Sequence, residues 1–143
     1  MTHFKTLTLT LLLICSNVTN ADPNTDAARE VIQQYIDGSS YTQREKLIEA
    51  FHPDATLYLT GKEGFDRYNP TQYADFFAHR EPGKFNGRIG KILSIEVTKD
   101  IATAKASISI QESNLVYIDL FLLKKTDEQW QIISKTATRL SDE

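Results

Sequence analysis

The sequence has very little cysteine: Cys15 is the only one in 143 residues. One cysteine cannot form a disulfide within the chain, so the fold must be held together by its core. No apolar run reaches the roughly 20 residues needed to cross a bilayer, which argues against a membrane span. The 16 basic and 19 acidic side chains are interspersed. Because no cluster of basic residues offers a surface for phosphates, nucleic acid is not an expected partner.

Motifs for metals and covalent catalysis are also missing. The histidines His52 and His79 are far apart in sequence, and no ligand pair has the spacing of a zinc or calcium site. The chain has no glycine-rich phosphate loop, no serine elbow and no cysteine nucleophile beyond residue 21. We therefore expect no metal and no cofactor, and hydrolysis through a covalent intermediate is disfavoured.

The amino terminus has the layout of a secretory signal. A single basic residue, Lys5, precedes an apolar run over residues 7–14, and Thr19-Asn20-Ala21 offers small residues at the cleavage site. We expect cleavage after Ala21, which leaves residues 22–143 as one mature domain, periplasmic or secreted. A domain of this length buries enough surface to fold alone.

A second interpretation of the amino terminus makes Cys15 the lipid-bearing first residue of a bacterial lipoprotein. Ile14 argues against it, because lipoprotein signals have a small residue just before the cysteine. The two interpretations differ in whether the protein is soluble or anchored.

Helical patterns fill the first half of the chain. Apolar residues recur every three or four positions from Asp26, and Gly38 is the expected end of that helix. Thr42 and Glu45 have the spacing of a capping box for a second helix, which Pro53 should stop. His52 would then stand at the end of this helix.

A short strand and a third helix follow. Alternation predicts a strand over Ala55–Thr60 and a turn or hairpin tip over Gly61–Asp66. Asn69, Pro70 and Gln72 form the cap and first turn of a helix that carries the inward residues Tyr73, Phe76 and Phe77.

The second half predicts four strands joined by short polar links, so neighbours should pair as antiparallel hairpins. They are Arg88–Thr98, Ile101–Gln111, Leu115–Lys125 and Gln129–Thr138. Helices followed by a meander indicate an α+β fold. Apolar residues lie on both faces of the third strand, so the sheet needs two covers: the helices on one face and, we expect, a second subunit in a homodimer on the other.

Several segments, in this order and spacing, resemble the nuclear transport factor 2-like (SnoaL-like) superfamily and, more narrowly, its putative lumazine-binding family. The resemblance implies a cone-shaped cystatin-like roll, in which three helices pack into a curved sheet. It does not establish an activity, because the superfamily includes enzymes, binding proteins and dimerising modules. The matching segments are Tyr35–Gly38, Ala50–Ala55, Arg88–Ile89, Asp100–Lys105, Val116–Asp119 and Leu122–Lys124.

Two titratable residues are candidates for catalysis. Asp119 lies mid-strand on the same face as Tyr117 and Phe121, where a carboxylate must find hydrogen bonds or a proton. It could act as a general base, anchor a ligand, or serve as a structural Asp bonded to nearby donors. His52 could shuttle protons into the cone or satisfy the last carbonyls of a helix.

Aromatic residues fall in the elements that would surround the cone, where they suit a flat apolar ligand or ordinary core packing. We therefore expect an exported pocket protein that binds a small apolar or aromatic molecule. The alternatives are a cofactor-free proton-transfer enzyme that uses Asp119, with a tyrosine or His52 as acid, and a dimerising interaction module. The candidate ligand-binding residues are Tyr35, Tyr58, Tyr73, Phe77, Tyr117 and Trp130.

Overall fold

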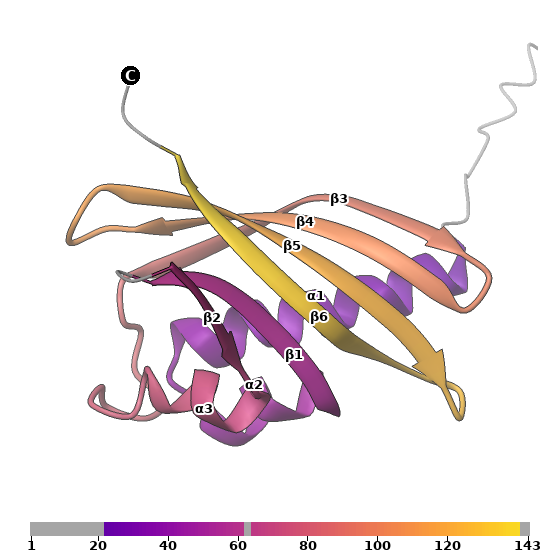
Figure 1. Cartoon of the computed structure of the whole chain (residues 1–143), viewed down its shortest axis with the longest axis horizontal. Helices are drawn as coiled ribbons and strands as arrows, with labels where there is room; N and C mark the ends of the chain where they lie inside the picture. The colour runs from indigo at the N-terminus through magenta and orange to yellow at the C-terminus, as the bar shows by residue number, and fades with distance from the viewer. Residues whose placement is uncertain (1–21, 62–63, 141–143) are drawn as a thin grey trace, which may run out of the picture.

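The computed structural model describes residues 22–61 and 64–140, so the predicted signal peptide and its cleavage site lie outside the described residues. Three helices gather on one side of a strongly twisted sheet (Figure 1). None of the helices in the described part is long and apolar enough to cross a membrane. The helices are α1 (Pro23–Ser40), α2 (Arg44–Glu49) and α3 (Pro70–Asp75).

Six strands form one sheet in the order β2-β1-β6-β5-β4-β3. All neighbours pair antiparallel except β1 and β6, which run parallel. The predicted α+β class, the three helices and the antiparallel meander of the last four strands are therefore confirmed. The strands are β1 (Phe51–Gly61), β2 (Gly64–Tyr68), β3 (Arg88–Thr98), β4 (Ile101–Ile110), β5 (Leu115–Thr126) and β6 (Gln129–Leu140).

Helix α1 continues past Gly38 to Ser40, so the predicted helix end was wrong. Gly38 instead permits a close crossing of helices: a Cβ there would lie 2.8 Å from the backbone nitrogen of Leu47 in α2. The left-handed residue that follows the helix is Thr42, with φ of 52°. Its hydroxyl accepts a hydrogen bond from the Asn86 side chain at 3.3 Å, so it does not cap α2 as predicted.

The predicted cap of α3 is confirmed. The Asn69 side chain accepts from the Gln72 backbone N–H at 2.8 Å, and the Gln72 side chain accepts from the Asn69 N–H at 2.9 Å. Pro70 follows as the first helical residue. This reciprocal box directs Tyr73 inward, where it is 5% exposed.

Strand β1 begins at Phe51 and contains Pro53, which the sequence pattern had placed at the end of a helix. The parallel register to β6 shifts between Phe51 and Thr56. Proline is tolerated within a sheet at such an irregularity because no regular ladder bond is required of it. As a consequence, His52 lies on a strand and not at a helix end.

The two faces of the sheet differ in what covers them. Small residues of β4 line the inner face, where Ala106 is fully buried and the helices pack. On the outer face Leu120 and Leu122 are 46% and 50% exposed. Both faces of the sheet thus carry apolar residues. The second subunit that we expect to cover the outer face stays a prediction.

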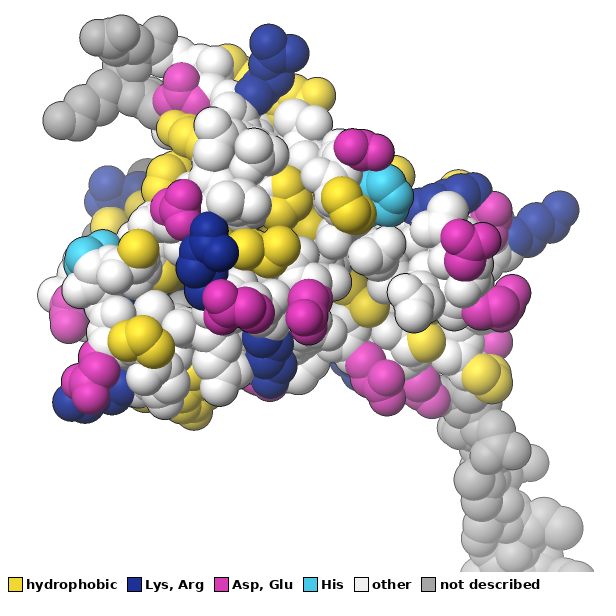
Figure 2. All heavy atoms as spheres, turned by 90° about the horizontal axis from the view of Figure 1, so that it is seen from below, with side chains coloured by type: hydrophobic (Ala, Val, Ile, Leu, Met, Phe, Trp, Pro, Cys, Tyr) yellow, Lys and Arg dark blue, Asp and Glu magenta, His cyan; other side chains and the backbone are white. Residues whose placement is uncertain are grey.

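The surface on the helical side carries scattered charge. Figure 2, which views the molecule from the lower side of Figure 1, shows carboxylates, lysines and arginines interspersed with separate hydrophobic side chains.

Candidate functional site

The inner face of the sheet carries a buried ion pair. Asp119 on β5 and Lys135 on β6 are 2% and 3% exposed, and the Lys135 Nζ lies 3.2 Å from the Asp119 Oδ1. Asp119 is paired with Ala137, and Lys135 lies two residues before Ala137 on the same strand. The pair is therefore a diagonal contact between neighbouring strands on one face.

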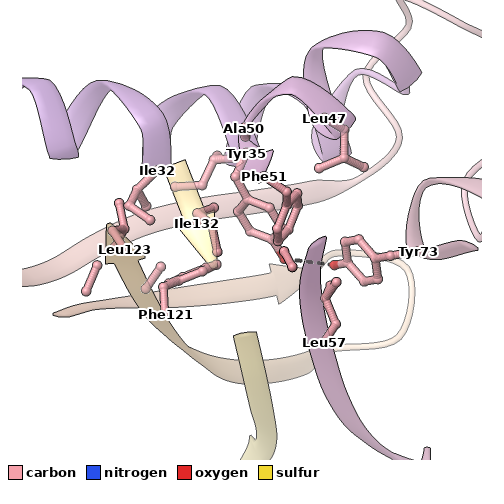
Figure 3. Close-up of a cluster of buried hydrophobic side chains, with 14 of the residues drawn as sticks. Ile32, Tyr35, Leu47, Ala50, Phe51, Leu57, Tyr73, Phe121, Leu123 and Ile132 are labelled. Atoms are coloured by element: carbon pink, nitrogen blue, oxygen red, sulfur yellow. Dashed lines mark hydrogen bonds between the residues drawn. The ribbon is translucent and has the colours of Figure 1, made fainter. Parts of the chain in front are cut away.

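A chain of hydroxyl groups ends on the other oxygen of this carboxylate. Tyr35 of α1 donates to the Asp119 Oδ2 at 2.7 Å, and the Tyr35 and Tyr73 hydroxyl oxygens lie 2.8 Å apart. Figure 3 shows the Tyr35 side chain reaching from α1 beside Phe51 toward Tyr73. Because Tyr35 has one proton and gives it to the carboxylate, Tyr73 is the donor in the second bond.

The environment keeps Tyr35 protonated. Burial raises the pKa of Tyr35 well above its usual value, and the neighbouring Asp119 and Tyr73 raise it further. A neutral phenol is the form that can donate to Asp119. The hydroxyl chain therefore keeps its direction, from Tyr73 through Tyr35 to the carboxylate.

Aromatic rings surround the Lys135 ammonium. Its Nζ lies 5.4 Å from the ring centre of Tyr73, 5.7 Å from that of Tyr35 and 5.9 Å from that of Phe121. Such contacts between a cation and ring faces are worth more where water is excluded. The rings and Asp119 together explain how a lysine is accommodated in the core.

A second cation, Arg88, stands at the start of β3. Its guanidinium carbon lies 5.2 Å from the ring centre of Phe77, and its Nε is buried without a hydrogen-bond partner among the described residues. Burial disfavours its charge, but Tyr73, Tyr35 and Asp119 outweigh this and raise the pKa of Arg88. Arg88 is therefore a cation, and two cations face the single carboxylate of Asp119.

These residues border a cavity of about 420 Å³ between α3 and the inner face of the sheet. Its wall is mostly apolar, and its polar residues belong to or adjoin the network just described. The apolar residues are Leu59, Phe76, Phe77, Ile110, Leu115 and Ala137. The polar residues are Tyr73, Arg88, Ser113, Tyr117, Asp119 and Lys135.

The structure brings together four of the predicted site residues. Asp119, Tyr73, Phe77 and Tyr117 all line this cavity. Tyr35 stands directly behind them, fully buried and bonded to both Asp119 and Tyr73. These five residues therefore lie in one group at the cavity, and their roles stay predictions.

Three other predicted residues lie elsewhere. Tyr58 lies on the outer face, 36% exposed, with its ring centre 6.0 Å from that of Phe65. Trp130 is buried beside a separate hollow of about 860 Å³, between α1 and the β5–β6 turn. The His52 Nδ1 accepts from the Asp54 backbone N–H at 3.1 Å, outside the cavity wall.

Sequence reasoning missed Arg88 and Lys135 as site residues. Strict alternation from Ile132 turns Lys135 to the outer face, but β6 has one extra residue, since Leu122 pairs with Ser134 and Leu123 with Ile132. The bulge reverses the alternation and turns Lys135 inward. Arg88 shares its face with the inward positions of β3, a signal that alternation could have supplied.

The residues that the structure describes hold no group of three or more histidine, cysteine or acidic side chains placed to bind a metal ion. The polar side chains of the cavity that offer hydrogen bonds and charge to a ligand include Tyr73, Asp119, Lys135 and Arg88.

Solved structures share this architecture. A nuclear transport factor 2-like protein of unknown function from Methylobacillus flagellatus aligns with a TM-score of 0.72 at 25% identity, over 87% of this chain and 98% of that one. A domain of unknown function with a cystatin-like fold from Nostoc punctiforme aligns at 0.65 with 20% identity, over 85% and 81% of the two chains. A ketosteroid isomerase-like protein from Erwinia carotovora atroseptica aligns at 0.63 with 13% identity, over 85% and 100%. The fold is thus the nuclear transport factor 2-like cone.

The family follows from the sequence match. The model of the putative lumazine-binding family matches residues 23–137. The chain belongs to this family, as the resemblance of its segments predicted. No curated protein matches the chain.

Proposed function

We propose that this protein binds a small apolar or aromatic molecule in the cavity beside Asp119. One observation carries the proposal: a cavity of about 420 Å³ has an apolar wall and a floor with a few fixed polar groups. Small-molecule sites commonly have volumes of roughly 300–1,000 Å³ and this division between wall and polar groups. The description of the family as putative lumazine-binding is consistent with such a ligand.

The polar floor is suited to orienting a ligand rather than reacting with it. Both oxygens of Asp119 are engaged, one by Lys135 and the other by Tyr35. The Tyr73 hydroxyl donates inward, so its oxygen retains a lone pair for a donor on the ligand. Tyr73 would thus fix the orientation of a ring held against Phe77.

The proposal includes export. A basic residue, an apolar run over residues 7–14 and a small-residue site ending at Ala21 support a cleaved signal peptide. The ligand would then be met outside the cytoplasm, in the periplasm or the medium.

A second candidate function is cofactor-free proton transfer. The observation that favours it is the hydroxyl chain from Tyr73, at the cavity, through Tyr35 to Asp119. In this alternative Tyr73 takes the acid role, since His52 lies outside the cavity wall. Asp119 would have to break its contact with Lys135 or Tyr35 to act as base, which makes binding the better-supported function.

We also propose that two copies of the chain form a homodimer through the outer face of the sheet. Exposed apolar residues from several strands lie there, and burying them against a second copy would remove a large apolar area from water. They include Ile89, Leu120, Leu122, Ile133 and Leu140.

Binding is tested with variants that fill the cavity. Ala137→Leu adds side-chain volume to the cavity wall, and Thr138→Leu is its matched control, because the next residue on β6 is exposed. In a thermal-shift screen of flat aromatic compounds, hits with the wild type and Thr138→Leu should be lost with Ala137→Leu. Hits that Ala137→Leu retains would exclude this cavity as the site.

A further inference from the structure

The charges around the cavity do not balance. The Lys135 ammonium is matched by Asp119 at 3.2 Å, whereas Arg88 has no carboxylate of its own within residues 22–61 and 64–140. Among the described residues, the enclosed Nε of Arg88 has no hydrogen-bond partner, and no carboxylate forms an ion pair with the guanidinium. A guanidinium cannot lose its charge in a protein, so the cavity keeps one positive charge in excess.

An unmatched cation in such a place calls for an anion. Arg88 is held against the Phe77 ring at 5.2 Å, and both residues line the cavity. Among the described residues, its Nε is enclosed without a partner, and Arg88 forms part of the cavity wall, so the guanidinium is placed to meet a molecule in the cavity. Burying a charge is costly unless it is paired and hydrogen-bonded.

We propose that the ligand is an aromatic or alicyclic carboxylate, whose acid group pairs with Arg88 while its ring lies against Phe77 and Tyr73. The inference rests on the proposed function and names the class of ligand for the same cavity. A planar guanidinium fork suits a planar carboxylate. A monoanion neutralises the single excess charge, whereas a dianion such as a phosphate monoester would leave a buried negative charge.

Isothermal titration with naphthoate, naphthamide and naphthyl phosphate tests this inference. These probes share a ring and differ in charge. Naphthoate should bind the wild type about tenfold or more tightly than naphthamide and naphthyl phosphate, because it alone forms a balanced ion pair with Arg88. Equal affinities for naphthoate and naphthamide would overturn the carboxylate proposal while leaving the binding function in place. No binding of either, with no aromatic hit from the screen, would overturn both.

Variants of Arg88 test whether the preference for naphthoate depends on this residue. Arg88→Gln should abolish the preference for naphthoate over naphthamide, and Arg88→Lys, which keeps the charge, should retain part of it. Lys91→Gln is the control, because Lys91 is an exposed cation on the same strand. It should leave the preference unchanged. A naphthoate preference that survives in Arg88→Gln would overturn the proposal. If that variant does not fold, Arg88→Lys takes its place, and a preference for naphthoate as strong as that of the wild type would overturn the proposal there.

Discussion

The Lys135 ammonium and the Asp119 carboxylate meet at 3.2 Å on the inner face of the sheet, and each residue is at most 3% exposed. Such a buried pair is compatible with a stable fold only while both partners are present. Removing either one would leave the other as an uncompensated buried charge. Asp119 is therefore first a structural residue, whose engaged oxygens fix the floor of the cavity.

Asp119→Asn should lower the free energy of unfolding by about 3 kcal/mol or more, since it leaves Lys135 buried without a counter-charge. Urea denaturation with circular dichroism measures this change. Asp100→Asn is the matched control, because Asp100 pairs with Lys124 at the surface and should change stability far less. If the two variants lose equally little, the buried pair does not stabilise the fold as described.

Tyr35→Phe should cost about 1–3 kcal/mol, because it leaves the Asp119 Oδ2 without its hydroxyl donor. Combined with Asp119→Asn, the loss should be smaller than the sum of the two single losses, since both substitutions break the same bond. A double-mutant cycle in urea measures the coupling. Strict additivity would show that the two residues do not act as one network.

Ionisation of Tyr35 should also lower the free energy of unfolding at alkaline pH. The pKa of Tyr35 is raised in the fold, mainly by burial, from the usual value of 10.0. The stability linked to this group is therefore fully present below pH 10.0 and lost as the pH rises through the higher folded pKa. Urea midpoints above pH 10 should decline less steeply in Tyr35→Phe than in the wild type, and parallel declines would contradict this account.

Two glycine-to-alanine substitutions should differ in whether a second substitution rescues them. A Cβ on Gly90 would lie 2.5 Å from the Ile36 side chain, whereas one on Gly38 would lie 2.8 Å from the Leu47 backbone. Both substitutions should destabilise the fold, although alanine ordinarily favours a helix over glycine by roughly 0.5–1 kcal/mol. Ile36→Ala should partly rescue Gly90→Ala, and Leu47→Ala should not rescue Gly38→Ala. Thermal melts of the four single and two double variants decide this.

Leu122→Lys should convert the proposed homodimer to a monomer, because it places a charge on the apolar outer face of β5. Tyr41→Lys is the control: Tyr41 is similarly exposed, at 42% against 50% for Leu122, but it follows α1 on the helical side. Light scattering at micromolar concentration gives the masses. A monomeric wild type would remove the dimer from the account.

Sequence alone predicted the strands that depend on simple alternation. The alternation over Leu115–Lys125 predicted that Asp119 points inward among apolar residues. In the structure Asp119 lies on β5 and is buried on the inner face. Lys135 could not be placed because its direction depends on one extra residue in β6, which only the pairing with β5 reveals. A bulge leaves little trace in local composition.

Long-range pairing explains the other differences. The predicted helix end at Pro53 was wrong because the parallel contact with β6 draws residues from Phe51 onward into β1. Tyr58 lies on the outer face because the pairing of β1 with β6 places its neighbour Leu57, opposite Lys135, on the inner face. The cavity itself is lined by residues of α3, β5 and β6 together, and no segment of the sequence specifies that arrangement by itself.

A crystal structure of the protein with naphthoate tests the proposal that the cavity beside Asp119 binds a small aromatic carboxylate. Density for the ring should lie against Tyr73 and Phe77, with the carboxylate within hydrogen-bond reach of Arg88. Naphthoate bound instead in the hollow beside Trp130, or on the outer face of the sheet, would contradict it.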